Sequence, residues 1–132
     1  MAPLWIALFR TGFCICFCVV TWLALTTSHL PGVLTIWDKG NHFSAFIVLS
    51  FLLDYSFPNP ATSPISPNWL KWLGLFAYGV GIECVQGWMG TRDFQWSDMF
   101  ADAVGISGYL AIRPFLQRIP WLAVLRHHNP QP

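Results

Sequence analysis

The sequence predicts an all-α fold, an integral membrane bundle of four transmembrane helices. Hydrophobic residues make up 55% of the 132 residues and aromatic residues 17%, whereas charged residues make up only 10%. Soluble domains carry about 25% charged residues, and a soluble domain of this size could not cover its surface with so few. A disordered chain would be poor in aromatic residues. The apolar residues also fall into four stretches, each of about the length that spans a bilayer.

The first expected helix covers residues 4–27. No Lys, Arg, Asp or Glu occurs between Arg10 and Asp38, so this stretch is apolar enough to cross a membrane. A cleaved signal peptide is the alternative reading. It is disfavoured because no Lys or Arg precedes Arg10 and no small-residue cleavage site follows the apolar run.

The second expected helix covers residues 41–57 and is rich in Phe, Leu, Ile and Val. A loop follows, because four of the ten prolines lie between Pro58 and Pro67. The third helix, residues 68–89, contains Glu83, and the fourth, residues 97–117, contains Asp98, Asp102 and Arg113. Charges inside spanning helices normally face the interior of the bundle.

Residues 1–120 are therefore expected to form one domain, and residues 121–132 a short cytoplasmic tail. Small residues in the third and fourth helices should allow close crossings between helices. These residues are Gly74, Gly81, Gly105 and Gly108.

The distribution of cations predicts the orientation of the bundle. Five cations lie near the side that carries the termini and the Pro-rich loop: Arg10, Lys71, Arg113, Arg118 and Arg126. Lys39 and Arg92 lie near the other side. Cytoplasmic loops carry the excess of Lys and Arg, so we expect cytoplasmic termini.

Polar residues collect at the opposite, outward side in pairs that share a helical face. The pairs have spacings of three or four residues and are Asp38 with His42, Glu83 with Gln86, and Asp98 with Asp102. Lys39 and Arg92 lie in the neighbouring connections. Three helices could thus direct carboxylates, an imidazole and an amide into one pocket.

Close carboxylates cannot all remain ionised unless a proton or a cation intervenes. Two solutions are open: a proton shared between carboxylates whose pKa values are raised, or a divalent cation as the cofactor, with Glu83, Asp98 and Asp102 as its ligands. The expected catalytic residues are Glu83, His42 and Asp98, because carboxylate and imidazole groups act as general acids and bases. The expected substrate-binding residues are Asp38, Lys39, Gln86, Arg92 and Asp102.

Structural roles compete with these assignments. Asp98 lies at the expected start of a helix, where an acid complements the helix dipole. Asp93 beside Arg92 could be a solvated ion pair in a loop. Glu83 lies within an apolar helix and needs a buried partner, for which Arg92, Lys39 and His42 are candidates. A purely structural ion network joining three helices remains the alternative to a functional pocket.

Two blocks of the sequence resemble the VanZ-like family of small bacterial membrane proteins. Asp38-Lys39, His42-Phe43 and Phe46 are similar to the first family signature. A later run of residues is similar to the second family signature. It contains, in order, Glu83, Gln86, Arg92, Asp98, Asp102 and Gly105. Asp102 stands where the family usually has Asn. The resemblance covers residues 38–108 and implies a multi-pass protein of the bacterial inner membrane with an envelope-related role, named for resistance to teicoplanin.

Three functions are weighed on these grounds. The first is a pocket that binds or processes an envelope lipid or lipid-linked precursor. The second is a non-catalytic accessory protein, whose polar cluster holds the bundle together. The third is a small proton-coupled transporter, which the lack of an inverted repeat disfavours. Membrane lipids are the expected partners. Nucleic acid is not expected, because a net charge of +1 provides no basic surface.

Overall fold

The computed structural model describes residues 4–26, 38–58, 68–90 and 92–127. Within these ranges the chain is helical and contains no strand. The elements are α1 (Leu4–Leu25), α2 (Asp38–Ser56), α3 (Asn68–Met89), α4 (Trp96–Leu116) and α5 (Pro120–His127). The expected all-α class is therefore confirmed.

The helix boundaries lie close to the expected ones, with two differences. Helix α2 begins at Asp38, three residues before the expected start, so Asp38 and His42 both belong to it. The expected polar tail begins with α5, a helix of 8 residues whose Leu122 is buried. Residues 128–132 of that tail lie outside the described residues.

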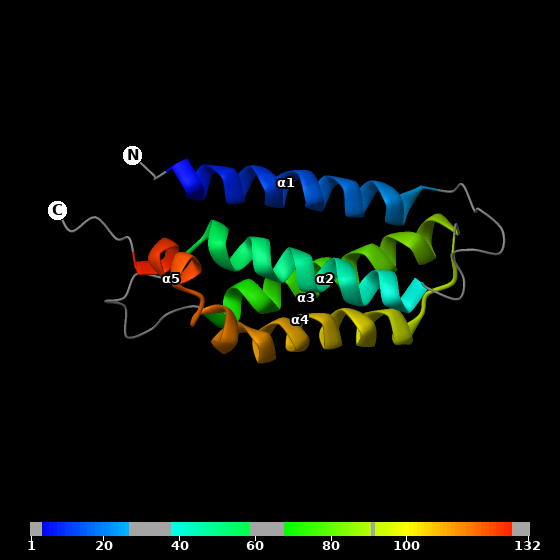
Figure 1. Cartoon of the computed structure of the whole chain (residues 1–132). Helices are drawn as coiled ribbons and strands as arrows, with labels where there is room; N and C mark the ends of the chain where they lie inside the picture. Colours follow the sequence, from blue (N-terminus) through cyan, green and yellow to red (C-terminus); the bar gives the residue numbers. More distant parts are fainter. Residues whose placement is uncertain (1–3, 27–37, 59–67, 91, 128–132) are drawn as a thin grey trace.

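The four long helices lie side by side and alternate in direction (Figure 1). The beginning of α1, the end of α2 and the whole of α5 lie at one end, which we call the Asp54 end. The end of α3 and the beginnings of α2 and α4 lie at the other, which we call the His42 end. The most extensive contact between two helices joins α2 and α4.

The core is formed by α2, α3 and α4. Phe46 and Leu49 of α2 pack with Leu75 of α3 and Ile106 of α4, and all four are buried. Helix α1 contributes partly buried side chains to this cluster but has no buried residue of its own. Hence α1 lies against a three-helix core rather than within it.

Two glycines permit the close approach of the helices. A Cβ atom on Gly105 of α4 would lie 2.7 Å from the Phe43 carbonyl oxygen of α2. A Cβ atom on Gly79 of α3, which the sequence did not single out, would lie 2.5 Å from Asp102 Oδ2. A side chain at either position would force the helices or the carboxylate to move. Gly74 and Gly81 were expected to do the same, but a Cβ on either would meet no atom within 4 Å.

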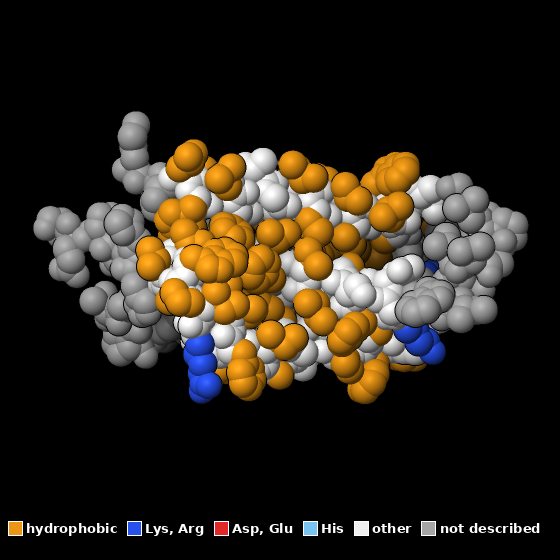
Figure 2. All heavy atoms as spheres, in the orientation of Figure 1, with side chains coloured by type: hydrophobic (Ala, Val, Ile, Leu, Met, Phe, Trp, Pro, Cys, Tyr) orange, Lys and Arg blue, Asp and Glu red, His pale blue; other side chains and the backbone are white. Residues whose placement is uncertain are grey.

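The surface of the bundle is apolar along its length. Large hydrophobic side chains are exposed on every helix, among them Val19, Leu73 and Phe100. Figure 2 shows hydrophobic side chains across one face of the bundle, with Lys and Arg visible only near the two ends. Among the described helices, α1 is the one whose length and composition suit it to cross a membrane, with a mean hydropathy of 2.0. The other long helices carry more charge, and most of their acids are buried between helices.

Candidate functional site

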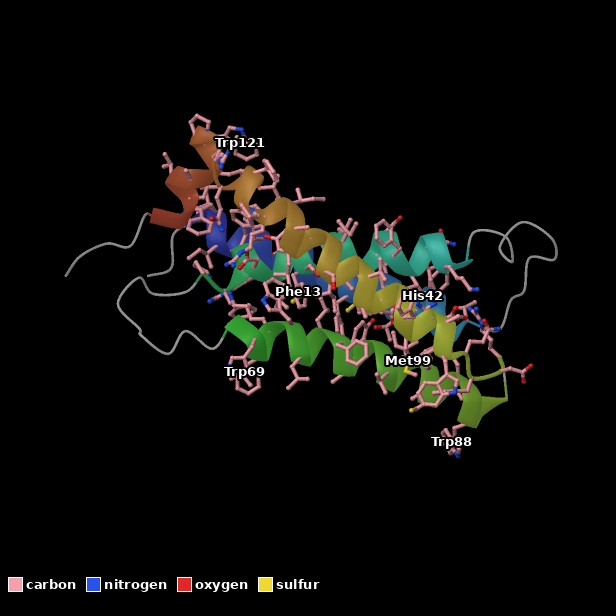
Figure 3. The ribbon with its side chains drawn as sticks, turned by 90° about the horizontal axis from the view of Figure 1, so that it is seen from below. Phe13, His42, Trp69, Trp88, Met99 and Trp121 are labelled. Carbon is pink, nitrogen blue, oxygen red and sulfur yellow. The ribbon has the colours of Figure 1, made fainter. Side chains whose placement is uncertain are left out.

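The polar residues of three helices meet at the His42 end, as the spacing predicts. We call this group the His42 cluster: His42 of α2, Glu83 and Gln86 of α3, Asp98 and Asp102 of α4, and Arg92 from the α3–α4 connection. Figure 3 shows His42 at this end of the bundle, with Met99 and Trp88, and Trp69 and Trp121 at the opposite end. The three acids are fully buried, whereas His42 and Arg92 are partly exposed.

The connection after α3 folds back over its own helix. Gly90 ends the helix with a φ of 66°, a left-handed conformation that glycine adopts without steric cost. The reversal returns Arg92 and the backbone of Gln95 to the cluster, where they contact Asp98 and Glu83. The local sequence thus supplies a cation and an N–H group to carboxylates that would otherwise lack them.

His42 is oriented by Asp102. Its Nδ1 lies 2.8 Å from Asp102 Oδ1, a distance at which an N–H group on Nδ1 donates a hydrogen bond to the carboxylate. The other ring nitrogen, Nε2, lies 3.9 Å from Asp98 Oδ2. A carboxylate on one side of an imidazole fixes the direction of the other nitrogen. Nε2 therefore faces the remaining acids.

Asp98 has a direct cationic partner. Arg92 donates through a terminal nitrogen to Asp98 Oδ2 at 2.8 Å. The sequence also allowed Asp98 a role limited to the helix dipole, but the side chain takes part in the cluster. Asp93, which was expected to form a solvated ion pair with Arg92, is exposed, while the Arg92 guanidinium contacts Asp98.

Glu83 is less well satisfied. Its Oε2 accepts a hydrogen bond from the Gln95 backbone N–H at 3.3 Å, and its Oε1 has no hydrogen-bond partner among the described residues. The same is true of Asp102 Oδ2 and Gln86 Oε1. The amide nitrogen of Gln86 donates to the Ala24 carbonyl of α1 at 2.6 Å. A buried acceptor without a donor destabilises a fold by about 1–3 kcal/mol, and more when it is charged.

Three ligand-type atoms, one each from His42, Glu83 and Asp98, lie within 4.8 Å of one another. The expected metal ligands were Glu83, Asp98 and Asp102. In the structure His42 joins the first two, while Asp102 Oδ1 contacts the imidazole. The sequence did not distinguish these arrangements because it could not give the direction of the ring.

A cavity of about 390 Å³ adjoins the cluster. Part of its wall is apolar and includes Val20 and Leu23 of α1, Phe46 of α2 and Ile82 of α3. The rest is polar and comes from Asn41, His42, Gln86, Arg92 and Asp102. The cavity thus joins an apolar surface to the polar groups of the His42 cluster.

Two of the expected substrate-binding residues, Lys39 and Asp38, are not among the described residues that line this cavity. Lys39 is exposed at the start of α2 and does not line it. The side chain of Asp38 lies outside the described residues, although its backbone begins α2.

A second polar group at the Asp54 end was not predicted as a site. We call it the Asp54 cluster: Asp54, Lys71, Tyr109 and Arg113. Asp54 Oδ2 accepts hydrogen bonds from Tyr109 at 2.8 Å and from Arg113 Nε at 2.9 Å. Its Oδ1 accepts from another Arg113 nitrogen at 3.3 Å and lies 3.6 Å from Lys71 Nζ. The sequence did contain a signal for this cluster, because Asp54 and Arg113 are charged residues within two of the expected spanning helices.

No model of a known protein family, no curated protein and no solved structure matches this chain.

Proposed function

We propose that this chain is a four-span protein of the bacterial inner membrane, with the Asp54 end in the cytoplasm. The four long helices have 22, 19, 22 and 21 residues, which at 1.5 Å per residue is roughly the thickness of the bilayer core. Buried acids with exposed apolar side chains are the distribution that a lipid environment favours. The excess of Lys and Arg at the Asp54 end supports the orientation.

A labelling experiment tests this orientation. Single cysteines replace Asp93 and Arg118, exposed residues at opposite ends, in a variant without Cys14, Cys16, Cys18 and Cys84. The cysteine at position 93 should react with an impermeant maleimide in intact cells, and the one at position 118 only after permeabilisation. The reverse pattern would place the His42 cluster in the cytoplasm. Equal labelling of both positions in intact cells would exclude the four-span arrangement.

We further propose that the His42 end binds or processes an envelope lipid or a lipid-linked precursor. The observation that carries this proposal is the cavity, whose apolar wall ends at charged and hydrogen-bonding groups. A lipid with a phosphate-bearing head has the same division into apolar and polar parts. The outward location that we propose for this end would give such a lipid access from the outer leaflet.

The side chains suggest distinct roles toward such a ligand. Arg92 reaches the cavity and presents the charge and geometry that suit a phosphate. Gln86 adds an amide to the same wall. His42 and Glu83 are the candidate general bases: His42 lines the cavity, and Glu83 Oε1 has no hydrogen-bond partner among the described residues.

The resemblance to the VanZ-like family is consistent with this proposal and adds a role related to glycopeptide resistance. The residue that departs from the family pattern, Asp102, accepts a hydrogen bond from His42. An Asn at this position could accept the same bond through its side-chain oxygen. The substitution is therefore compatible with a shared orientation of the imidazole.

A non-catalytic accessory role is the second candidate, and a specific contact favours it. The bond between His42 and Asp102 joins α2 to α4, so the cluster also holds the bundle together. The two candidates differ in whether the cavity takes up a lipid. A purely structural cluster predicts no lipid at this position.

Lipid binding can be measured by native mass spectrometry of the protein in detergent. The panel contains a polyprenyl phosphate, phosphatidylglycerol and a neutral diacylglycerol. We expect the phosphate-bearing lipids to bind, with affinity at least tenfold lower in Arg92→Gln and unchanged in Arg118→Gln. Arg118 is exposed at the opposite end and serves as the matched control. Equal affinity for all three lipids, or equal loss in both variants, would favour the accessory role.

A further inference from the structure

We propose that His42, Glu83 and Asp98 form a binding site for a divalent metal ion of the zinc or manganese class. One ligand atom from each residue lies within 4.8 Å of the other two. The three residues come from α2, α3 and α4, so the ion would join the three helices of the core. This inference does not depend on lipid binding and can be tested without a lipid.

Buried acceptor atoms without hydrogen-bond donors are an independent reason to expect a cation at this site. Glu83 and Asp102 are fully buried, yet Glu83 Oε1 and Asp102 Oδ2 have no hydrogen-bond partner among the residues that the structure describes. Gln86 Oε1, also buried, is in the same condition beside them. Oxygen atoms without donors, gathered in a single buried region, are the chemistry that attracts a cation.

The charge of the cluster gives the same result. Three buried acids face one arginine, Arg92, and one imidazole, His42. The ionised acids exceed the arginine by two negative charges when the imidazole is neutral, and exceed both cations by one when it is protonated. Either excess is costly to bury uncompensated, and a divalent ion bound to the neutral imidazole would neutralise the larger one.

Asp102 would act on the ion through His42 rather than as a ligand. Imidazoles that bind metals usually donate their other N–H to a carboxylate or carbonyl, which fixes the ring and increases its basicity. The Nδ1–Oδ1 contact of 2.8 Å is of this kind and leaves Nε2 for the ion. Asp102 is therefore a positioning residue.

The donor atoms indicate the class of ion. Mg²⁺ and Ca²⁺ prefer oxygen ligands alone, whereas an imidazole nitrogen with carboxylates suits zinc and manganese. Bonds of about 2.0–2.2 Å in a tetrahedral site place ligand atoms about 3.3 Å apart. The side chains would close from their present separation by rotation. Three protein ligands leave one position open, and His42 also lines the cavity, so a ligand in the cavity could take that position.

The experiment uses the purified full chain in detergent, stripped of metal with a chelator. Zn²⁺, Mn²⁺, Mg²⁺ and Ca²⁺ are added separately, and bound metal is counted by inductively coupled plasma mass spectrometry after gel filtration. We expect one equivalent of Zn²⁺ or Mn²⁺ and none of the other two ions. Co²⁺ should give visible absorption bands of a low-coordinate site with nitrogen and oxygen donors.

Variants assign the ligands. His42→Ala and Glu83→Gln should each lower metal affinity at least a hundredfold, and Asp102→Asn about tenfold. Asp93→Asn, an exposed acid at the same end, should leave affinity unchanged. Glu83→Gln keeps the shape of the side chain, and a thermal melt in chelator shows whether it folds.

Three results would overturn the proposal. The first is wild-type protein that retains no Zn²⁺ or Mn²⁺ after gel filtration, and the second is equal retention by wild type and a His42→Ala, Glu83→Gln double variant. The third is a preference for Mg²⁺ or Ca²⁺, since the imidazole would then have no place among the ligands. None of these results would bear on lipid binding, because the two measurements are separate.

Discussion

The two ends of the bundle bury acids in opposite ways. At the Asp54 end a single carboxylate receives hydrogen bonds from Tyr109 and Arg113 on both of its oxygens. At the His42 end three carboxylates share one arginine and one imidazole, and acceptor atoms of Glu83 and Asp102 are left without donors. Full burial is common to both ends. A structural ion pair therefore differs from a candidate site in whether its buried carboxylate oxygens receive hydrogen bonds, and not in whether they are buried.

The difference follows from the number of cations that each acid meets. Asp54 has Arg113 and Lys71 within ion-pair distance. In a medium of low dielectric constant such a group is stable only when its geometry and hydrogen bonds are nearly complete, as they are here. The His42 cluster lacks that compensation and has room beside it for a ligand. This difference supports the proposals that the Asp54 cluster stabilises the fold and that the His42 cluster binds a ligand.

The largest predicted effect is on stability at the Asp54 end. Asp54→Ala should lower the free energy of unfolding by about 3–5 kcal/mol, because it leaves Arg113 and Lys71 near the core without their acid. Unfolding in mixed detergent micelles, followed by tryptophan fluorescence, measures the change. Asp93→Ala, at an exposed acid, is the control. A loss below about 1 kcal/mol would mean that water already compensates the ion pair.

An intermediate effect is expected from a change of volume at the His42 end. Gly79→Ala should destabilise the fold by about 1–3 kcal/mol, because its Cβ would lie 2.5 Å from Asp102 Oδ2 and 2.9 Å from the Phe46 ring. Displacement of Asp102 should also weaken metal binding. Gly81→Ala on the same helix meets no atom within 4 Å and should be neutral or slightly stabilising. Thermal melts of the two variants compare them directly, and equal melting temperatures would contradict the close packing at Gly79.

The smallest effect is expected at Glu83. In chelator, Glu83→Gln should change the free energy of unfolding by less than about 1 kcal/mol, since the amide oxygen can still accept from Gln95 and a like charge is removed. Chemical unfolding of both proteins under identical conditions measures this. A loss as large as that of Asp54→Ala would show that Glu83 belongs to a structural ion pair, and the contrast between the two ends would fail.

The sequence predicted the helices well because their signal is local. Apolar length and the prolines of residues 58–67 place α1 to α4 to within a few residues. It also predicted that Glu83 shares a helical face with Gln86, and Asp98 with Asp102, because their spacings are three and four residues. That these faces could turn toward one pocket was an expectation from their common end of the bundle, and the structure brings them together with His42.

What the sequence could not supply was the pairing between helices. The contact of Asp54 with Arg113 joins residues 59 positions apart, and its hydrogen-bond geometry exists only after α2 and α4 have packed. Gly79 could not be separated from Gly81 for the same reason, since the rotation of α3 decides which of them faces Asp102. Likewise, the choice between His42 and Asp102 as a ligand depends on the orientation of one ring.

The position of α1 has a consequence for access to the cavity. Helix α1 contributes no buried residue, although its contact with α2 is more extensive than that of α3 with either α2 or α4. Val20, Leu23 and Ala24 of α1 form one wall of the cavity. An outward movement of α1 would therefore open the cavity along this wall, and a ligand that fills the cavity would hold α1 in place.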